Sequence, residues 1–170
     1  LDPNMSFKNN LVIIVKPLPR YPAKMYEEGL TLIISKILRN HRESINPNAK
    51  SGNYLNNVMA IKEAKKLNVD DAIMINQSGD ITEGTTFNIW CIKDGVIYTP
   101  PEKSGLLKGI TRQKVLDLCK KENLNYSIQV FKSDFILNAD EVFITSSTKG
   151  VMPVKKIDDK VYGNTISDWP

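Results

Sequence analysis

Residues 71–100 read DAIMINQSGDITEGTTFNIWCIKDGVIYTP, and this stretch indicates the type of fold. Three apolar runs in it, DAIMIN, FNIWCIK and VIYTP, are rich in β-branched and aromatic residues and are separated by turn residues. Such runs are typical of short β-strands. Asp94-Gly95, between two of the runs, is the strongest local signal for a β-hairpin in the chain. We therefore expect an antiparallel pair of strands here.

Helical and strand-like segments alternate on both sides of this stretch. Residues 53–67 carry apolar side chains at helical spacing, and residues 111–122 predict a second helix with Thr111 as its N-cap. Further strands are expected at 11–15, 29–38, 126–131 and 141–145, a short helix at 132–140, a loop over 39–50 with a turn-rich segment before Tyr26, and a final hairpin over 151–163. The sequence therefore predicts a mixed α/β (α+β) fold and not a simple doubly wound parallel sheet.

Composition and charge argue against several classes of protein. A chain of 170 residues can form one good hydrophobic core, and its net charge of +4 comes from scattered basic residues, which disfavours nucleic-acid binding. A single histidine, His41, and two distant cysteines, Cys91 and Cys119, offer no metal cluster. We expect both cysteines to be buried free thiols in a reducing, cytoplasmic environment. No apolar run approaches the length of a membrane span.

Four stretches combine a special backbone with a reactive or polar group. Lys50, in AKSGNYLNN, stands where a helix is about to begin, although most lysines are surface charges. Glu83, in ITEGTTFNIW, could direct a carboxylate at a ligand's ring nitrogen or belong to an ordinary turn. Gly109, ahead of a helix, exposes N–H groups that suit a phosphate, as would any capped helix start. Residues 145–148, TSST, form either an anion cradle or a solvated turn.

In this order the motifs resemble the class IV family of pyridoxal-phosphate enzymes (fold type IV), which includes branched-chain and D-amino-acid aminotransferases and aminodeoxychorismate lyase. The resemblance runs from residue 26 to residue 163. It rests on AKSGNYLNN, ITEGTTFNIW, VIYTPP, GITRQ, and ADEVFITSS followed by MPV. It implies pyridoxal 5′-phosphate as the cofactor, bound by a large domain with a mixed sheet or pseudo-barrel and flanking helices.

The resemblance implies chemical roles for three side chains. Lys50 would form the internal aldimine with the cofactor's aldehyde and then move the substrate's α-proton. Tyr54 would hydrogen-bond the cofactor's phenolic oxygen. Glu83 would lie at the pyridine nitrogen and keep it protonated.

The resemblance also implies which residues bind the two anionic groups. The backbone of Ile110 and Thr111, with Ser147, would hold the cofactor's phosphate. Ser147 and the amide of Thr148 would contact the substrate's carboxylate. The implied cofactor-binding set is completed by Thr86, Asn88, Gly109 and Ser146.

The implied function is amino transfer from a branched-chain L-amino acid to 2-oxoglutarate, and Tyr54 favours this branch over the D-amino-acid branch. One alternative is an aminodeoxychorismate lyase, in which the same lysine assists elimination of pyruvate. Another, of a different class, is an inactive cofactor-binding fragment or scaffold. Gly150 stands where many aminotransferases of the family have glutamate, a departure that bears on substrate choice.

The resemblance implies a division of the chain and an assembly. Residues 1–17 are expected to be the remnant, with the last strand, of a small N-terminal domain. Residues 18–25 would be an interdomain linker and residues 26–170 the cofactor-binding large domain. We therefore expect the chain to be a piece of a longer protein that forms a homodimer.

Overall fold

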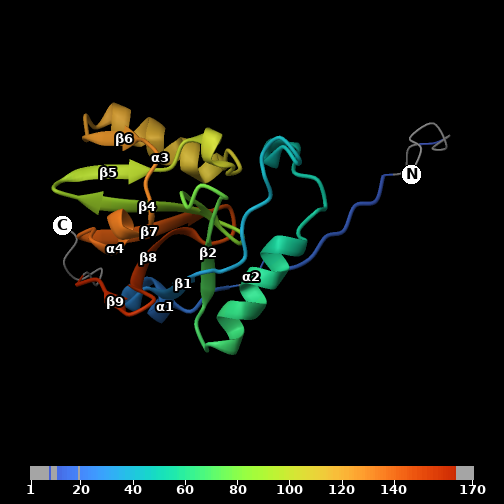
Figure 1. Ribbon diagram of the computed structural model, residues 1–170, viewed down its shortest axis with the longest axis horizontal. Coiled ribbons are helices and arrows are strands. Elements are labelled where there is room, and N and C mark those ends of the chain that lie inside the picture. The colour runs from blue at the N-terminus through green and yellow to red at the C-terminus, as the bar shows by residue number, and fades with distance from the viewer. Residues whose placement is uncertain (1–7, 9–10, 19, 164–170) are drawn as a thin grey trace.

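The computed structural model describes residues 8, 11–18 and 20–163, which form a mixed sheet with helices on both faces (Figure 1). The helices are α1 (Ala23–Glu28), α2 (Leu55–Lys66), α3 (Ile110–Lys121) and α4 (Ser133–Leu137), with short 3-10 turns η2 (Pro47–Ala49) and η3 (Glu102–Ser104). The strands are β1 (Leu30–Ile34), β2 (Asp71–Ile75), β3 (Ile81–Gly84), β4 (Asn88–Lys93), β5 (Val96–Thr99), β6 (Tyr126–Ile128), β7 (Glu141–Ser146), β8 (Gly150–Ile157) and β9 (Lys160–Val161).

The sheet combines parallel and antiparallel pairs, in the order β3-β2-β1-β8-β7-β4-β5-β6, with β9 paired to β8. β1 runs parallel to β2 and β8, whereas β4 runs antiparallel to β5 and β7. The β4–β5 hairpin turns at Asp94 and Gly95, whose φ angles of 50° and 73° lie in the left-handed region that such a turn requires. The predicted mixed fold and the predicted hairpin are therefore both confirmed.

The strands alternate their side chains between two layers of core. On β1, Leu32 packs into the large cluster that α1 and α4 cover, while Ile33 packs against Ala60 and Ala64 of α2. On β4, Trp90 points to the other side of the sheet from its neighbours and stacks on Phe143 beneath α3, at a ring-centroid distance of 5.5 Å. Residues at the starts of α2 and α3 and at the ends of β3 and β7 together line the cavity described below.

One predicted strand is wrong, and one helix is missing from the sequence prediction. Leu11–Val15 forms no strand: these side chains are 72–89% exposed, and Figure 1 shows the segment extended away from the sheet. A strand needs a neighbour for its backbone hydrogen bonds, and none of the described strands pairs with this segment. Helix α1 lies inside the segment read as turns. It begins after Pro22 and ends at Gly29, whose φ of 80° few other residues adopt.

Smaller differences concern the ends of elements. The N-cap of α3 is Gly109 and not Thr111, and no side chain caps this helix. The strand predicted over 126–131 ends at Ile128. The helices and strands expected at 29–38, 53–67, 132–140, 141–145 and 151–163 are present with shifted ends, and both cysteines are buried and unpaired as expected. Residues 1–7, 9–10, 19 and 164–170 lie outside the described part, and the division into domains stays a prediction.

Candidate active site

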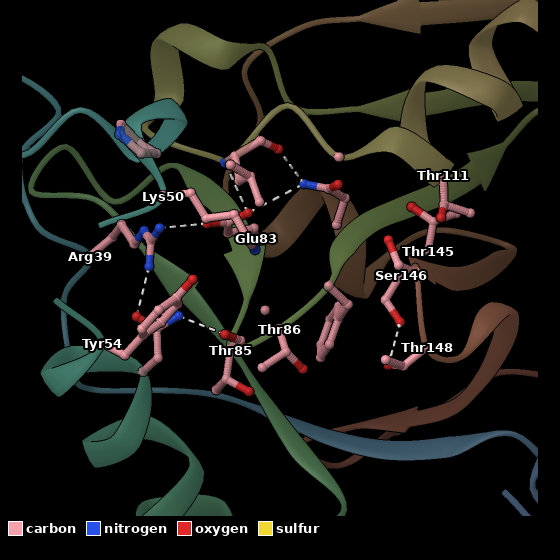
Figure 2. A pocket seen from close by; sticks show the side chains of 18 of the residues that line it. Arg39, Lys50, Tyr54, Glu83, Thr85, Thr86, Thr111, Thr145, Ser146 and Thr148 are labelled. Carbon is pink, nitrogen blue, oxygen red and sulfur yellow. Dashed lines mark hydrogen bonds and ion pairs between the residues drawn. The ribbon is translucent and has the colours of Figure 1, made fainter. Parts of the chain in front are cut away.

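A cavity of about 490 Å³ opens where the first turns of α2 and α3 meet the ends of β3 and β7. Every residue predicted for the site from the sequence lines it: Lys50, Tyr54, Glu83, Thr86, Asn88, Gly109, Ile110, Thr111, Ser146, Ser147 and Thr148. Figure 2 shows Arg39, Lys50 and Glu83 on one side of this cavity and Thr111, Ser146 and Thr148 on the other. The fold thus brings together residues from Lys50 to Thr148, which are 98 positions apart in the chain.

Glu83 is the buried acid of the cavity, with only 5% of its surface exposed. Its Oε1 lies 2.6 Å from Nη2 of Arg39, and its Oε2 accepts hydrogen bonds from the backbone N–H of Leu107 at 3.0 Å and from Asn88 at 3.3 Å. Burial raises the pKa of Glu83 to about 7, against the lowering effects of Arg39, the Leu107 N–H and Lys50. The carboxyl group is therefore held in place and titrates near neutrality.

Arg39, which sequence reasoning missed, connects this acid to the start of α2. Besides the ion pair, its Nη1 donates to Asn57 Oδ1 at 2.9 Å and its Nε to the carbonyl of Gly105 at 3.3 Å. Asn57 in turn donates to the carbonyl of Thr85 at 2.6 Å. No local signal pointed to this network. The apolar residues Leu55, Val58 and Met59, whose spacing indicates the inner face of the helix, are 46–64% exposed. The buried face of α2 instead carries Asn57 together with Ala60 and Ala64.

Lys50 lies in the turn that follows η2, with its side chain exposed to the cavity mouth. Its φ of 46° places it in the left-handed region, which is uncommon for a residue with a side chain and is often found at functional sites. The turn is fixed from outside, because Asn48 Oδ1 accepts a hydrogen bond from the backbone N–H of Lys108 at 2.9 Å. The ammonium charge is close enough to Glu83 to lower that residue's pKa.

The start of α3 forms another wall and presents backbone N–H groups to the cavity. Asn88 donates to the carbonyl of Leu107 at 2.9 Å, which fixes the segment just ahead of the helix. A Cβ on Gly109 would overlap Asn88 Oδ1, so only glycine allows this close approach. The unsatisfied N–H groups at a helix start favour an anion, and Ile110 and Thr111 lie at this position.

The hydroxyl residues at the end of β7 and just after it differ in exposure. Thr145 lines the cavity although it is only 1% exposed, and its hydroxyl accepts a hydrogen bond from Trp90 Nε1 at 2.9 Å. Ser146 Oγ lies 3.4 Å from Thr148 Oγ1, and Ser147 and Thr148 are exposed at the cavity. All four hydroxyl residues of the cradle expected from the sequence therefore line the cavity.

These donors fit pyridoxal 5′-phosphate chemically. The cavity offers a primary amine on Lys50, a buried carboxyl on Glu83, and hydroxyl and N–H groups on the opposite wall. These groups match an aldehyde, a ring nitrogen and a phosphate, respectively. Within the described residues no cluster of three or more metal-ligating side chains occurs, and no helix there is long and apolar enough to cross a bilayer.

Comparisons with known proteins agree with this chemistry. The chain matches the family described as amino-transferase class IV over residues 3–157. It is 36% identical over 164 residues to a putative branched-chain-amino-acid aminotransferase of Methanocaldococcus jannaschii, covering 96% of this chain and 56% of that protein. It is 43% identical over 143 residues to the D-alanine aminotransferase of Bacillus licheniformis, covering 84% and 49%. The chain thus spans about half the length of the curated relatives it matches.

Solved structures show the same likeness. The branched-chain amino acid aminotransferase of Escherichia coli aligns with a TM-score of 0.81 at 32% identity, covering 84% of this chain and 47% of that one. The corresponding enzyme of T.th., solved in complex with N-(5′-phosphopyridoxyl)-L-glutamate, aligns with a TM-score of 0.78 at 33% identity, covering 82% and 47%. The family match covers most of the chain, and the predicted site residues, including Lys50 and Glu83, line one cavity. The chain therefore belongs to the class IV aminotransferase family.

Proposed function

We propose that this chain is the cofactor-binding part of a pyridoxal-phosphate-dependent aminotransferase that moves an amino group between an amino acid and a 2-oxo acid. The observation that carries the proposal is that one cavity contains both the exposed amine of Lys50 and the buried carboxyl of Glu83. An amine for the cofactor's aldehyde and a carboxylate for its ring nitrogen are the two groups that this chemistry needs from the protein.

The residues would divide the work as follows. When bound, pyridoxal phosphate supplies a protonated ring that can accept the electron pair left at the substrate's α-carbon. The Lys50 amine would bind the cofactor's aldehyde carbon and later move the proton at the substrate's α-carbon. Ionised Glu83 would hold a proton at the ring nitrogen, and Arg39 keeps the Glu83 carboxylate in position.

The opposite wall would hold the anionic groups. The backbone N–H groups of Ile110 and Thr111 and the Ser147 hydroxyl would bind the phosphate, while the Thr148 amide would bind the substrate's carboxylate. The Tyr54 hydroxyl would donate to the cofactor's phenolic oxygen. Thr86, Asn88, Gly109 and Ser146 would complete the binding surface.

For the substrates, we propose a branched-chain L-amino acid and 2-oxoglutarate. Support comes from the branched-chain aminotransferases among the relatives and solved structures, and from Tyr54. D-Alanine aminotransferases also match, at up to 43% identity, so D-alanine is the competing donor. Turnover of L-leucine but not of D-alanine by the protein would support the first pair, and the reverse result would replace it.

A second candidate, of another class, is an assembly part that binds the cofactor without turning over substrate. The observation that favours this candidate is that the chain spans only about half the length of each relative. For the same reason, we propose both the activity of the whole protein and the expected homodimer. Sedimentation of the protein with cofactor tests the homodimer, and a monomer at micromolar concentration would contradict it.

The decisive experiment traps the cofactor on the chain. Purified protein is mixed with pyridoxal 5′-phosphate, reduced with borohydride, digested and analysed by mass spectrometry. We expect a visible absorbance band before reduction and a covalent adduct on Lys50, with none on Lys108, an exposed lysine that does not line the cavity. A Lys50→Ala variant should lose both signals while keeping its fold. Labelling spread evenly over surface lysines would overturn the proposal.

A further inference from the structure

Lys149 follows directly on the exposed hydroxyl residues, yet most of its own side chain is covered. Only 12% of the side-chain surface is exposed, and Nζ lies 3.4 Å from Oδ2 of Asp71, the first residue of β2. Asp71 is itself 4% exposed and lies 78 positions earlier in the chain. A lysine that crosses from a surface loop to a buried carboxylate is uncommon, because desolvation of both charges is costly.

The surroundings of this ion pair are part of the cavity wall. The ammonium lies 5.5 Å from the ring centroid of Phe87 and 5.8 Å from that of Tyr21, within reach of a cation–π interaction. The other oxygen of Asp71 accepts the Thr85 hydroxyl at 2.5 Å. Tyr21, Thr85 and Phe87 all line the cavity, so the ion pair lies directly behind this wall.

The backbone of Lys149 is held as firmly as its side chain. Its N–H donates to Ser146 Oγ at 3.0 Å, and its carbonyl accepts the Tyr26 hydroxyl of α1 at 3.0 Å. Ser147 and Thr148, which lie between Ser146 and Lys149 in the chain, are exposed. We refer to residues 146–149 as the hydroxyl loop. Lys149 is the residue that connects the loop to both α1 and β2.

We infer that Lys149 is a positioning residue that holds the hydroxyl loop in the geometry needed to bind an anion in the cavity. A buried ion pair gives little net stability against an apolar replacement, but it can fix one arrangement of the groups around it. Here it fixes the segment from which Ser147 and Thr148 reach the cavity. The inference rests on the proposed function, because it takes the phosphate of pyridoxal phosphate as the anion.

The test compares two ligands that differ only in the phosphate. Dissociation constants for pyridoxal 5′-phosphate and for pyridoxal are measured by equilibrium dialysis, and their ratio isolates the contribution of the phosphate. Both ligands react with Lys50 through the same aldehyde, so effects on that step cancel in the ratio. We expect Lys149→Met to reduce the preference for the phosphorylated ligand about tenfold, equivalent to roughly 1.4 kcal/mol.

Three further variants complete the design. Lys149→Arg keeps the charge and should retain most of the preference. Lys24→Met removes an exposed lysine that also pairs with a carboxylate, that of Glu28, and should leave the preference unchanged. Asp71→Asn can keep the hydrogen bonds to Thr85 and Ala72 while losing the charge, and should reproduce the effect of Lys149→Met. This last variant provides the test if Lys149→Met fails to fold.

The outcomes separate this inference from the proposed function. Wild-type protein that binds neither ligand would contradict the proposed function. Wild-type protein that prefers the phosphorylated ligand, with the same preference in Lys149→Met or in Asp71→Asn, would overturn the inference alone. Equal losses in Lys149→Met and Lys149→Arg would also overturn it, because the charge would then not be the cause.

Discussion

The two reactive groups of the cavity lie in opposite environments. Glu83 is 5% exposed and has three partners: Arg39 at 2.6 Å, the Leu107 N–H at 3.0 Å and Asn88 at 3.3 Å. Lys50 is exposed on a turn, and the structure gives no hydrogen bond or ion pair to its side chain among the described residues. One group is built into the core and the other is presented from a turn.

The difference follows from the two proposed tasks. A carboxyl group that must hold a proton at a fixed point has to be oriented in advance, and a buried carboxyl must find partners in any case. An amine that must exchange between a covalent bond and a free form needs room to move. We therefore expect substitutions near Glu83 to affect folding and those near Lys50 to affect chemistry alone.

The largest expected effect on stability comes from Arg39→Met. Without Arg39, ionised Glu83 would stay buried without its ion-pair partner, with only the exposed Lys50 ammonium near it, which costs about 3–5 kcal/mol. Urea unfolding at pH 8 measures the loss, and the loss should shrink at pH 5, where Glu83 takes up a proton. Lys108→Met, which breaks the exposed pair with Glu102, should cost at most about 1 kcal/mol. Equal losses in the two variants would contradict the contrast between the buried and the exposed pair.

The next effect is a pH dependence that Glu83→Gln should remove. Because the pKa of Glu83 is raised from 4.5 to about 7 by burial, the folded state binds a proton that the unfolded state has released. The stabilisation from this proton is complete below pH 4.5 and is lost as the pH rises through 7, by roughly 3 kcal/mol in total. Unfolding free energies between pH 4 and 8 should show this fall only in the wild type. A constant difference between the two proteins would mean that Arg39 keeps Glu83 ionised throughout.

The smallest effect compares two glycines beside the same cavity. In Gly109→Ala the new methyl group would overlap Asn88, which is already bonded to Glu83 and Leu107, so we expect a loss of about 1–3 kcal/mol. Gly52→Ala, near Lys50, meets no atom within 4 Å and should change stability by no more than about 0.5 kcal/mol. Thermal unfolding of both variants makes the comparison. A larger loss at Gly52 would show that the Lys50 turn is also tightly packed.

The sequence allowed most of the elements to be predicted where the signal is local. The Asp94-Gly95 hairpin and the helices over 53–67 and 111–122 follow from turn chemistry and from a repeat of apolar residues within a few positions. The strand predicted for Leu11–Val15 was wrong because this prediction also used only a local signal. An apolar run indicates a strand, but a strand forms only beside a pairing neighbour, which local sequence cannot reveal.

The candidate site divides in the same way. Lys50, Glu83 and the residues at the start of α3 could be proposed from motifs, because their chemistry is tied to short stretches of sequence. Arg39 carried no such signal, since its partner is 44 positions away and many arginines in loops face solvent.

The amino-acid sequence by itself thus determined the class of fold, the family resemblance and the residues with reactive groups. The tertiary structure alone decided which charges are buried and paired: Glu83 with Arg39, and Asp71 with Lys149. The physical reason is that burial and pairing are properties of three-dimensional neighbours. A carboxylate acquires its pKa, and a loop its fixed shape, only when distant segments pack around it.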